Sequence, residues 1–207
     1  MRHGHGEALL PMIDRVMAAA GLAPTRLDIV AAAAGPGGFT GIRVGLAAAH
    51  GIALAAGARL VGVSSFEAVA AAVRNVAARD GRSLLVCLDS RREDLYVQLF
   101  GRDDGGPLND PQAVLPGVLA DCLAAAGLKQ DMPLLIAGDA AAAAAGALGK
   151  RSSIAVADNS APDALGVAAA VSRLLRDGAA FGPARPLYLR PPDVTVAKSR
   201  QVSVSVP

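Results

Sequence analysis

The chain has 207 residues, of which 53% are hydrophobic and 3% aromatic, and its 20 Lys and Arg residues nearly balance 18 Asp and Glu residues. This length can form one domain or two small lobes with a substantial core. The net charge of +2 does not indicate a strongly basic nucleic-acid-binding surface. Cys87 and Cys122 form no C-x-x-C pair, which favours buried free thiols in a reducing compartment over a disulfide.

The sequence predicts no secretory or membrane-spanning segment. The longest charge-free run, 44–58, has 15 residues, fewer than the roughly 20 apolar residues that a membrane span needs. The N-terminus carries Arg2 and two histidines but no apolar stretch typical of a signal peptide. These features favour a cytoplasmic protein.

Helices and strands are expected to alternate in the first part of the chain. Thr40 is the predicted N-cap of an apolar helix that Gly57 ends. Ser64 and Glu67 have the spacing of a capping box, which predicts another helix start. In chain order we expect a helix at 7–20, a strand at 27–33, a helix at 40–56, a strand at 59–63 and a helix at 64–78.

After Asp80 and Gly81 the pattern changes, because two strand-like runs at 83–89 and 94–100 flank a charged turn and predict a hairpin. Asp139 is the predicted cap of an alanine-rich helix. The remaining expected elements are a polar turn at 103–111, a helix at 116–126, a strand at 133–137, a helix to 148, a strand at 153–157 and a helix at 162–177. The tail at 194–207 alternates valine with polar residues, so it reads as an edge strand or as disorder, with disorder favoured past Lys198.

A glycine-rich loop joins the strand at 27–33 to the helix at 40–56. A loop on a helix N-terminus can hold an anion with free N–H groups; alternatively, its glycines make a tight turn and let neighbouring elements pack closely. The loop lacks the Lys-Ser/Thr pair of a P-loop and the third glycine of a dinucleotide fingerprint. Its motif residues are Gly35, Pro36, Gly37, Gly38, Phe39, Thr40, Gly41 and Arg43.

Two other groups of polar residues are weaker candidates for a site. His3, His5 and Glu7 could hold a metal from an extended N-terminal segment, or could simply be solvated. The charged residues of the hairpin turn could orient a hydroxyl or a metal-bound phosphate, or be solvated as turn residues usually are; they are Asp89, Arg91, Arg92, Glu93 and Asp94.

No nucleophile with a partner base can be assembled from the sequence. His50 belongs to an apolar helix and Cys87 to an apolar strand, so neither has the neighbours that a catalytic triad or a Cys-His pair requires. The sequence therefore predicts no catalytic residues.

The motifs resemble those of the bacterial TsaB family, also called YeaZ. Segment 35–45, Gly-Pro-Gly-Gly-Phe-Thr-Gly-Ile-Arg-Val-Gly, is similar to the signature G-P-G-S-F-T-G-[LIV]-R-[IV]-G, with Gly38 where serine is usual. The resemblance extends to His5–Ile13 (H-x-E-x-L-L-P-x-I), to Gly62-Val63-Ser64-Ser65, to Leu88–Tyr96 and to Ala184–Arg190 (A-x-P-x-Y-L-R). Members of the family begin with further strands and an Asp-Thr-Ser turn, which this sequence does not show.

The resemblance implies an α/β fold with two lobes, of the actin/Hsp70/sugar-kinase (ASKHA) type, whose first lobe lacks its initial strands. We expect a first lobe at 1–80, a second lobe at 81–185 and a C-terminal tail at 186–207. A start codon upstream of Met1 is favoured over a truncated form.

The same resemblance implies a non-catalytic scaffold for making N6-threonylcarbamoyladenosine in tRNA (t6A37). The implied partners are a TsaD-like transferase, as a heterodimer, and a TsaE-like ATPase; a homodimer and a nucleotide at the interface with TsaD are left open. Contact with tRNA is expected only through the complex, and no metal, other cofactor or membrane is implied. A metal-dependent glycoprotease-type peptidase and an ATP-binding kinase-like enzyme are the alternatives.

The resemblance places the partner interface on the two helices of the first lobe. Small residues there would let helices approach closely, while a purely internal role for each residue is the alternative. The expected interface residues are Leu9, Leu10, Ile13, Met17, Gly41, Gly45 and Ala48.

Overall fold

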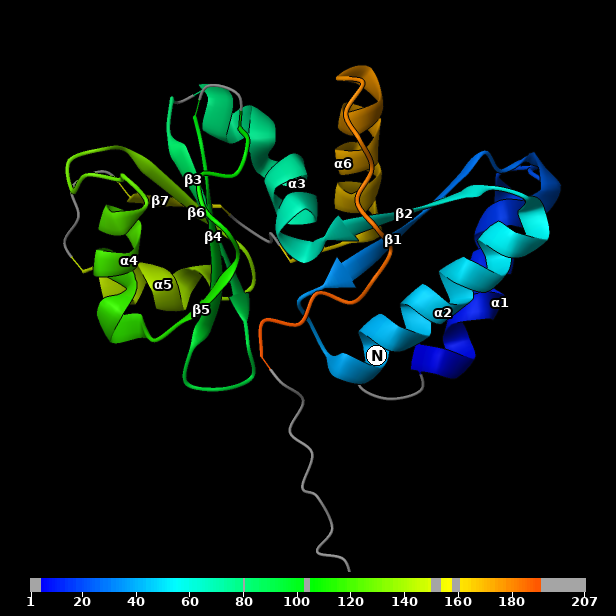
Figure 1. Cartoon of the computed structure of the whole chain (residues 1–207), viewed down its shortest axis with the longest axis horizontal. Coiled ribbons are helices and arrows are strands. Elements are labelled where there is room, and N and C mark those ends of the chain that lie inside the picture. Colours follow the sequence, from blue (N-terminus) through cyan, green and yellow to red (C-terminus); the bar gives the residue numbers. More distant parts are fainter. Residues whose placement is uncertain (1–4, 80, 103–104, 150–153, 158–160, 191–207) are drawn as a thin grey trace, which may run out of the picture.

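The computed structural model describes residues 5–79, 81–102, 105–149, 154–157 and 161–190. Two separate sheets form two α/β lobes, and an extended segment near the C-terminus runs from one lobe to the other (Figure 1). His3 of the candidate metal cluster and the alternating tail at 194–207 lie outside the described residues.

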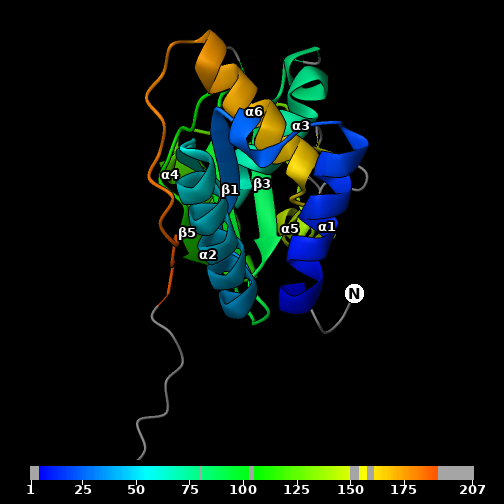
Figure 2. The ribbon, with the colours of Figure 1, turned by 90° about the vertical axis from the view of Figure 1, so that its right-hand side faces the viewer.

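The first lobe contains a two-stranded parallel sheet of β1 (Ile29–Gly35) and β2 (Arg59–Ser64). Helix α2 (Phe39–Ala56) packs against β1, and α1 (His5–Ala19) packs against α2, with a short 3-10 helix (Pro24–Arg26) between α1 and β1. The other side of the sheet is covered by α3 (Ser65–Arg79) and α6 (Ala164–Arg176), which pack together (Figures 1 and 2).

The second lobe contains a five-stranded mixed sheet in the order β5-β4-β3-β6-β7. Strands β3 and β4 form the predicted antiparallel hairpin, and β6 and β7 run parallel to β3. Helices α4 and α5 cover one face of this sheet, and α3 covers the other. The elements are β3 (Ser83–Asp89), β4 (Leu95–Phe100), β5 (Gln112–Val114), α4 (Leu119–Ala125), β6 (Leu134–Ala137), α5 (Ala141–Leu148) and β7 (Ile154–Val156).

Helix α3 contacts both lobes, because its buried residues belong to two core clusters, one on each sheet. Phe66 and Val69 of α3 pack in the cluster that contains Val86 of β3. Ala68 of the same helix packs with the β2 valines and α6. Helix α6 lies after residue 80 in the chain but packs on the first sheet, and α3 packs on both sheets. The expected boundary between a first lobe at 1–80 and a second lobe at 81–185 therefore stays a prediction.

Local capping signals were partly predictive. Ser64 and Glu67 form the expected capping box: the Ser64 N–H donates to Glu67 Oε2 at 2.7 Å, and the Glu67 N–H donates to Ser64 Oγ at 3.0 Å. The prediction of Thr40 as N-cap was wrong, because the Ile42 N–H already bonds to the Gly38 carbonyl at 3.0 Å and α2 starts at Phe39. Gly57 ends α2 in the left-handed region (φ 68°), as predicted.

The Asp139 cap was also wrong. Ala140 is the N-cap of α5, while the Asp139 carboxylate accepts a hydrogen bond from the Asp89 N–H at 2.9 Å. The helix expected at 116–126 is divided into a 3-10 turn, Pro116–Val118, and α4. Strand β5 was not predicted, since three residues are too few to show a period.

The sequence-based expectation of no membrane-spanning segment rested on the charge-free run 44–58, but helix α2 is longer than this run because it includes Arg43. Over Phe39–Ala56, with a mean hydropathy of 1.4, the helix is long and apolar enough to cross a membrane by length and composition alone. In the structure the helix instead packs along β1 and α1. Leu46, Ala49 and Ala53 are its buried residues.

Candidate functional site

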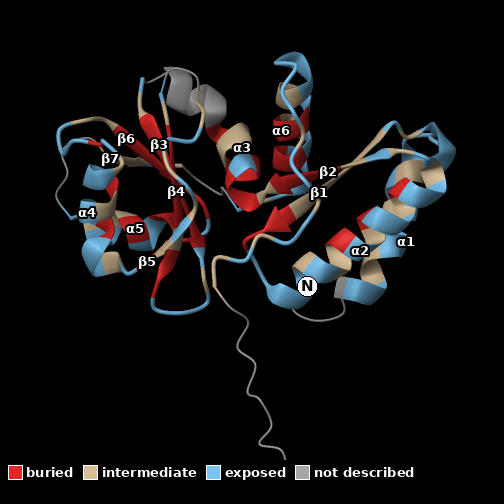
Figure 3. Cartoon of the chain, in the orientation of Figure 1, coloured by how far each residue is buried: buried red, intermediate tan, exposed pale blue. Residues whose placement is uncertain are grey.

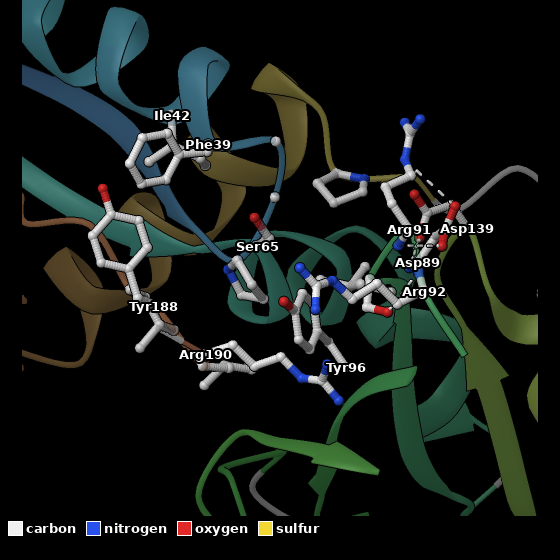
Figure 4. A pocket seen from close by; sticks show the side chains of 18 of the residues that line it. Phe39, Ile42, Ser65, Asp89, Arg91, Arg92, Tyr96, Asp139, Tyr188 and Arg190 are labelled. Carbon is white, nitrogen blue, oxygen red and sulfur yellow. Dashed lines mark hydrogen bonds and ion pairs between the residues drawn. The ribbon is translucent and has the colours of Figure 1, made fainter. Parts of the chain in front are cut away.

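A cleft with a volume of about 690 Å³ lies between the two lobes (Figure 4). The glycine loop forms its wall on the first lobe, and the hairpin turn between β3 and β4 forms the wall on the second lobe. The extended C-terminal segment supplies a third wall. Lining side chains include those of Phe39, Ser65, Asp89, Tyr96, Asp139 and Tyr188.

The glycine loop is held against the C-terminal segment. A Cβ on Gly35, whose φ is +102°, would lie 3.2 Å from the Leu187 carbonyl oxygen and 3.3 Å from Ile42 Cδ1. Gly37 and Gly38 are exposed at the cleft, and Gly38 is the N-cap of α2, which has no side-chain cap. The loop therefore makes the tight turn expected from its glycines, and its backbone faces the cleft.

The charged hairpin turn is divided between solvent and core. Arg91, with φ 62°, lies on the surface with its Nε 3.5 Å from Asp89 Oδ2. Asp94 is only 2% exposed. Its Oδ2 is 2.6 Å from Nη2 of Arg190, and the Ser90 hydroxyl lies 2.6 Å from its carbonyl oxygen. Asp94 is thus a buried structural carboxylate, so the five turn residues do not form one open cluster.

The other candidate groups remain dispersed. Within the described residues, no group of three or more His, Cys, Asp or Glu side chains could hold a metal ion. His50 lies on α2 with Nε2 3.4 Å from the Ala184 carbonyl oxygen. Both cysteines are free, as predicted; Cys87 is buried, whereas Cys122 is half-buried.

Burial raises the pKa of the Cys87 thiol strongly and also raises the pKa of Cys122. Since the thiolate is the reactive form, we expect iodoacetamide at pH 8 to modify Cys122 slowly in the folded protein and to leave Cys87 unmodified. Mass spectrometry of the native and the urea-unfolded protein checks this. Rapid native modification of Cys87 would contradict the buried position.

A second feature of the first lobe is the set of exposed apolar residues on α1 and α2, two helices of which most residues are exposed or half-buried (Figure 3). Of the expected interface residues, Leu10 and Gly41 are exposed, and the others are half-buried: Leu9, Ile13, Met17, Gly45 and Ala48. Met12 and Val16 of α1 and Leu54 of α2 are further exposed apolar side chains. Leu54, which is 86% exposed, lies nine residues after Gly45 and therefore on the opposite side of α2. These three were missed because helical spacing alone did not show which side of each helix the sheet would cover.

The glycines of this surface have no packing role among the described residues. A Cβ built on Gly41 or Gly45 would meet no heavy atom within 4 Å. The alternative explanation, that these two glycines let a neighbouring element of the same chain pack closely, is therefore wrong for the described residues. Gly35, by contrast, is closely enclosed.

Two lobes with separate sheets, joined through a shared helix and flanking a cleft, define a two-lobed α/β protein. Its structural neighbours and matching family model give the fold as the expected ASKHA type. The family model for TsaD, tRNA N6-adenosine threonylcarbamoyltransferase, matches residues 1–107, which is half of the chain. In structure, the chain is similar to a Pseudomonas aeruginosa protein described as similar to peptidase YEAZ: the TM-score is 0.76 at 20% identity, covering 92% of this chain and 86% of that one. The YeaZ structure from P. aeruginosa gives a TM-score of 0.72 at 21% identity, covering 89% of this chain and 84% of that one.

The chain belongs to the TsaB (YeaZ) family. It is 33% identical over 104 residues to the Escherichia coli tRNA threonylcarbamoyladenosine biosynthesis protein TsaB, a match that covers 49% of this chain and 43% of that protein. It is 32% identical over 195 residues to an uncharacterized Mycobacterium tuberculosis (strain H37Rv) protein, covering 91% of this chain and 76% of that one. The chain thus spans less than half of the E. coli relative and about three quarters of the mycobacterial one.

Proposed function

We propose that this chain is a non-catalytic scaffold that activates the formation of threonylcarbamoyladenosine in tRNA by binding a TsaD-like transferase. The name of the E. coli relative, a tRNA threonylcarbamoyladenosine biosynthesis protein, supports the pathway. The match of residues 1–107 to the TsaD family model supports a partner of related fold. A TsaE-like ATPase would join the pair in the cytoplasm, and tRNA would be contacted through the complex.

The observation that carries this proposal is the unpartnered surface of α1 and α2. Leu10 is 52% exposed and Val16 is 63% exposed, so apolar area remains open to solvent on α1. On α2, the open space around Gly41 and Gly45 would let a partner helix approach the backbone closely. Exposed large apolar side chains are common at protein interaction sites, and they support a partner on these two helices.

The cleft supports a scaffold role less directly. Three of its charged residues pair within the chain: Asp89 with Arg91, and Arg190 with the buried Asp94. In the proposed scaffold role the catalytic groups come from the TsaD-like partner, and a nucleotide could be shared with the partner only at the interface. Formation of a homodimer through the same surface would compete with the transferase for binding.

Reconstitution tests the proposal. The assay contains a TsaD-like transferase, a TsaE-like ATPase, ATP, threonylcarbamoyl-adenylate and tRNA, with this chain added or omitted. We expect modified adenosine, quantified by mass spectrometry of digested tRNA, to form only when the chain is present. Undiminished product on omission would show that the chain is not required.

A further inference from the structure

Residues 181–190, which we call the strap, cross from the first lobe to the second and belong to no helix or strand. At its start the strap lies on the free edge of β2, where the Gly62 N–H donates to the Gly182 carbonyl at 3.2 Å. A Cβ on Gly62 would overlap the Pro183 carbonyl and lie 2.8 Å from Ala184 Cα. Because the strap backbone lies directly against Gly62, any side chain at this position would displace the strap from β2.

The middle of the strap is tied to β1 and α2. The Leu187 N–H donates to the Ala34 carbonyl at 2.7 Å, at the end of β1. Tyr188 stacks on Phe39 with ring centroids 5.5 Å apart, and its hydroxyl accepts a hydrogen bond from Arg43 Nε at 2.9 Å. The Arg43 guanidinium also lies over the Phe39 ring, 3.7 Å from its centroid, so a cation–π contact completes the group.

The end of the strap is held by the second lobe. Leu189 packs against the core cluster of β3 and β4. Arg190, which lines the cleft (Figure 4), pairs with the buried carboxylate of Asp94 at 2.6 Å. Asp94 directly precedes β4 and holds Ser90 of the cleft turn. Removing the partner of a buried carboxylate is strongly destabilising, so loss of the Arg190 contact is unfavourable while Asp94 stays buried.

We propose that the strap is a clamp that fixes the separation of the two lobes and connects the N-terminus of α2 to the cleft turn. Two-lobed proteins change shape mainly by hinge motion between their lobes. Here one short segment is bonded to β2, β1 and α2 on one side and to Asp94 on the other, so opening the cleft requires breaking the contacts at one end. A displacement of Arg43 or Phe39 reaches Ser90 through Tyr188, Arg190 and Asp94. This inference concerns the isolated chain and does not depend on the proposed function.

The clamp can be tested on the full chain by the distance between the lobes. Spin labels would be attached to Ala55→Cys on α2 and Ala142→Cys on α5, both exposed positions, in a Cys122→Ser background. With Arg190 present, double electron–electron resonance should give one narrow distance population. Arg190→Ala should broaden it and shift it to longer distances, and Arg190→Lys should restore it in part.

The exposed Arg185 provides a matched control, since it is an arginine of the same strap that lies away from Asp94. Arg185→Ala should leave the distance distribution unchanged. If Arg190→Ala does not fold, the double variant Asp94→Asn/Arg190→Gln removes both charges and leaves no lone carboxylate in the core. A narrow, unshifted distribution in a folded Arg190→Ala or double variant would overturn the clamp.

A separate variant tests the connection to α2. Tyr188→Phe keeps the stacked ring but removes the hydroxyl that accepts from Arg43. We expect faster hydrogen exchange both in peptides covering 39–43 and in peptides covering 89–94, with circular dichroism unchanged. A purely local role of Tyr188 would speed exchange at 39–43 alone, and that result would overturn the proposed coupling.

Discussion

A Gly138→Ala variant is expected to lose at least about 3 kcal/mol of stability and to accumulate poorly as soluble protein. Gly138 follows β6 with φ +110°, a conformation that an L side chain rarely adopts. A Cβ there would overlap the carbonyl oxygen of Cys87 and lie 2.8 Å from its carbonyl carbon. The same carbonyl accepts a hydrogen bond from the Ala140 N–H at 3.2 Å, so β3 cannot move away without losing the start of α5.

Gly146→Ala is the matched control for this prediction. Gly146 lies inside α5, and a Cβ built on it would meet nothing within 4 Å, so alanine should add up to about 1 kcal/mol through its higher helix propensity. Urea denaturation followed by circular dichroism compares the two variants. A Gly138→Ala protein as stable as the wild type would show that the turn between β6 and α5 can rearrange.

The position of Gly138 also matters for the cleft. It precedes Asp139, whose carboxylate accepts a hydrogen bond from the Asp89 N–H on the second-lobe wall of the cleft. The ends of β3 and β6 are therefore fixed to each other at the cleft by both a backbone contact and a side-chain bond. Any rearrangement of this turn should alter the cleft wall.

Elements whose signals are local were predictable from the sequence. The capping box at Ser64 and Glu67 depends on residues three apart, and the glycine that ends α2 depends on a single conformational preference. The hairpin of β3 and β4 was predicted from two apolar runs around a polar turn, and the register pairs Asp89 with Leu95 across that turn. Each of these signals lies within a few residues of the structure it specifies.

Elements whose partners are distant in sequence were not predictable. Asp139 has the residue type of an N-cap, but its carboxylate instead accepts a hydrogen bond from the N–H of Asp89, which is 50 residues away. The strap has no period and no turn signal that would reveal its contacts with Gly62 and Ala34. Its motif was recognised only through the family resemblance, and the contact between Arg190 and Asp94 required the folded chain.

The candidate site was predictable in its glycine loop but not in its geometry. The glycines at 35–38 predicted a tight turn, and the structure places that turn at the cleft. That Gly41 and Gly45 face open space, while Gly35 is enclosed, depends on where α1 and the strap lie. Composition alone could not distinguish an enclosed glycine from one beside open space.

A Gly45→Leu variant is expected to bind a TsaD-like partner at least about 30-fold more weakly, or ~2 kcal/mol, without loss of its own stability. No heavy atom of the described chain lies within 4 Å of a Cβ at this position, and leucine favours helix formation over glycine by roughly 0.8 kcal/mol or less. The added side chain would instead fill the space that a partner helix needs beside α2. Titration calorimetry measures the affinity, and the tRNA modification assay measures the activity.

Gly146→Leu should separate the partner effect from the effect of a bulky residue in a helix. It is also a helical glycine with open space around it, but it lies on α5 of the second lobe. We expect this variant to keep both partner affinity and activity. Equal affinities for Gly45→Leu, Gly146→Leu and the wild type would place the partner interface away from α2. A loss confined to Gly45→Leu, with an unchanged melting transition, would locate the interface at the face of α2 that carries Gly41 and Gly45.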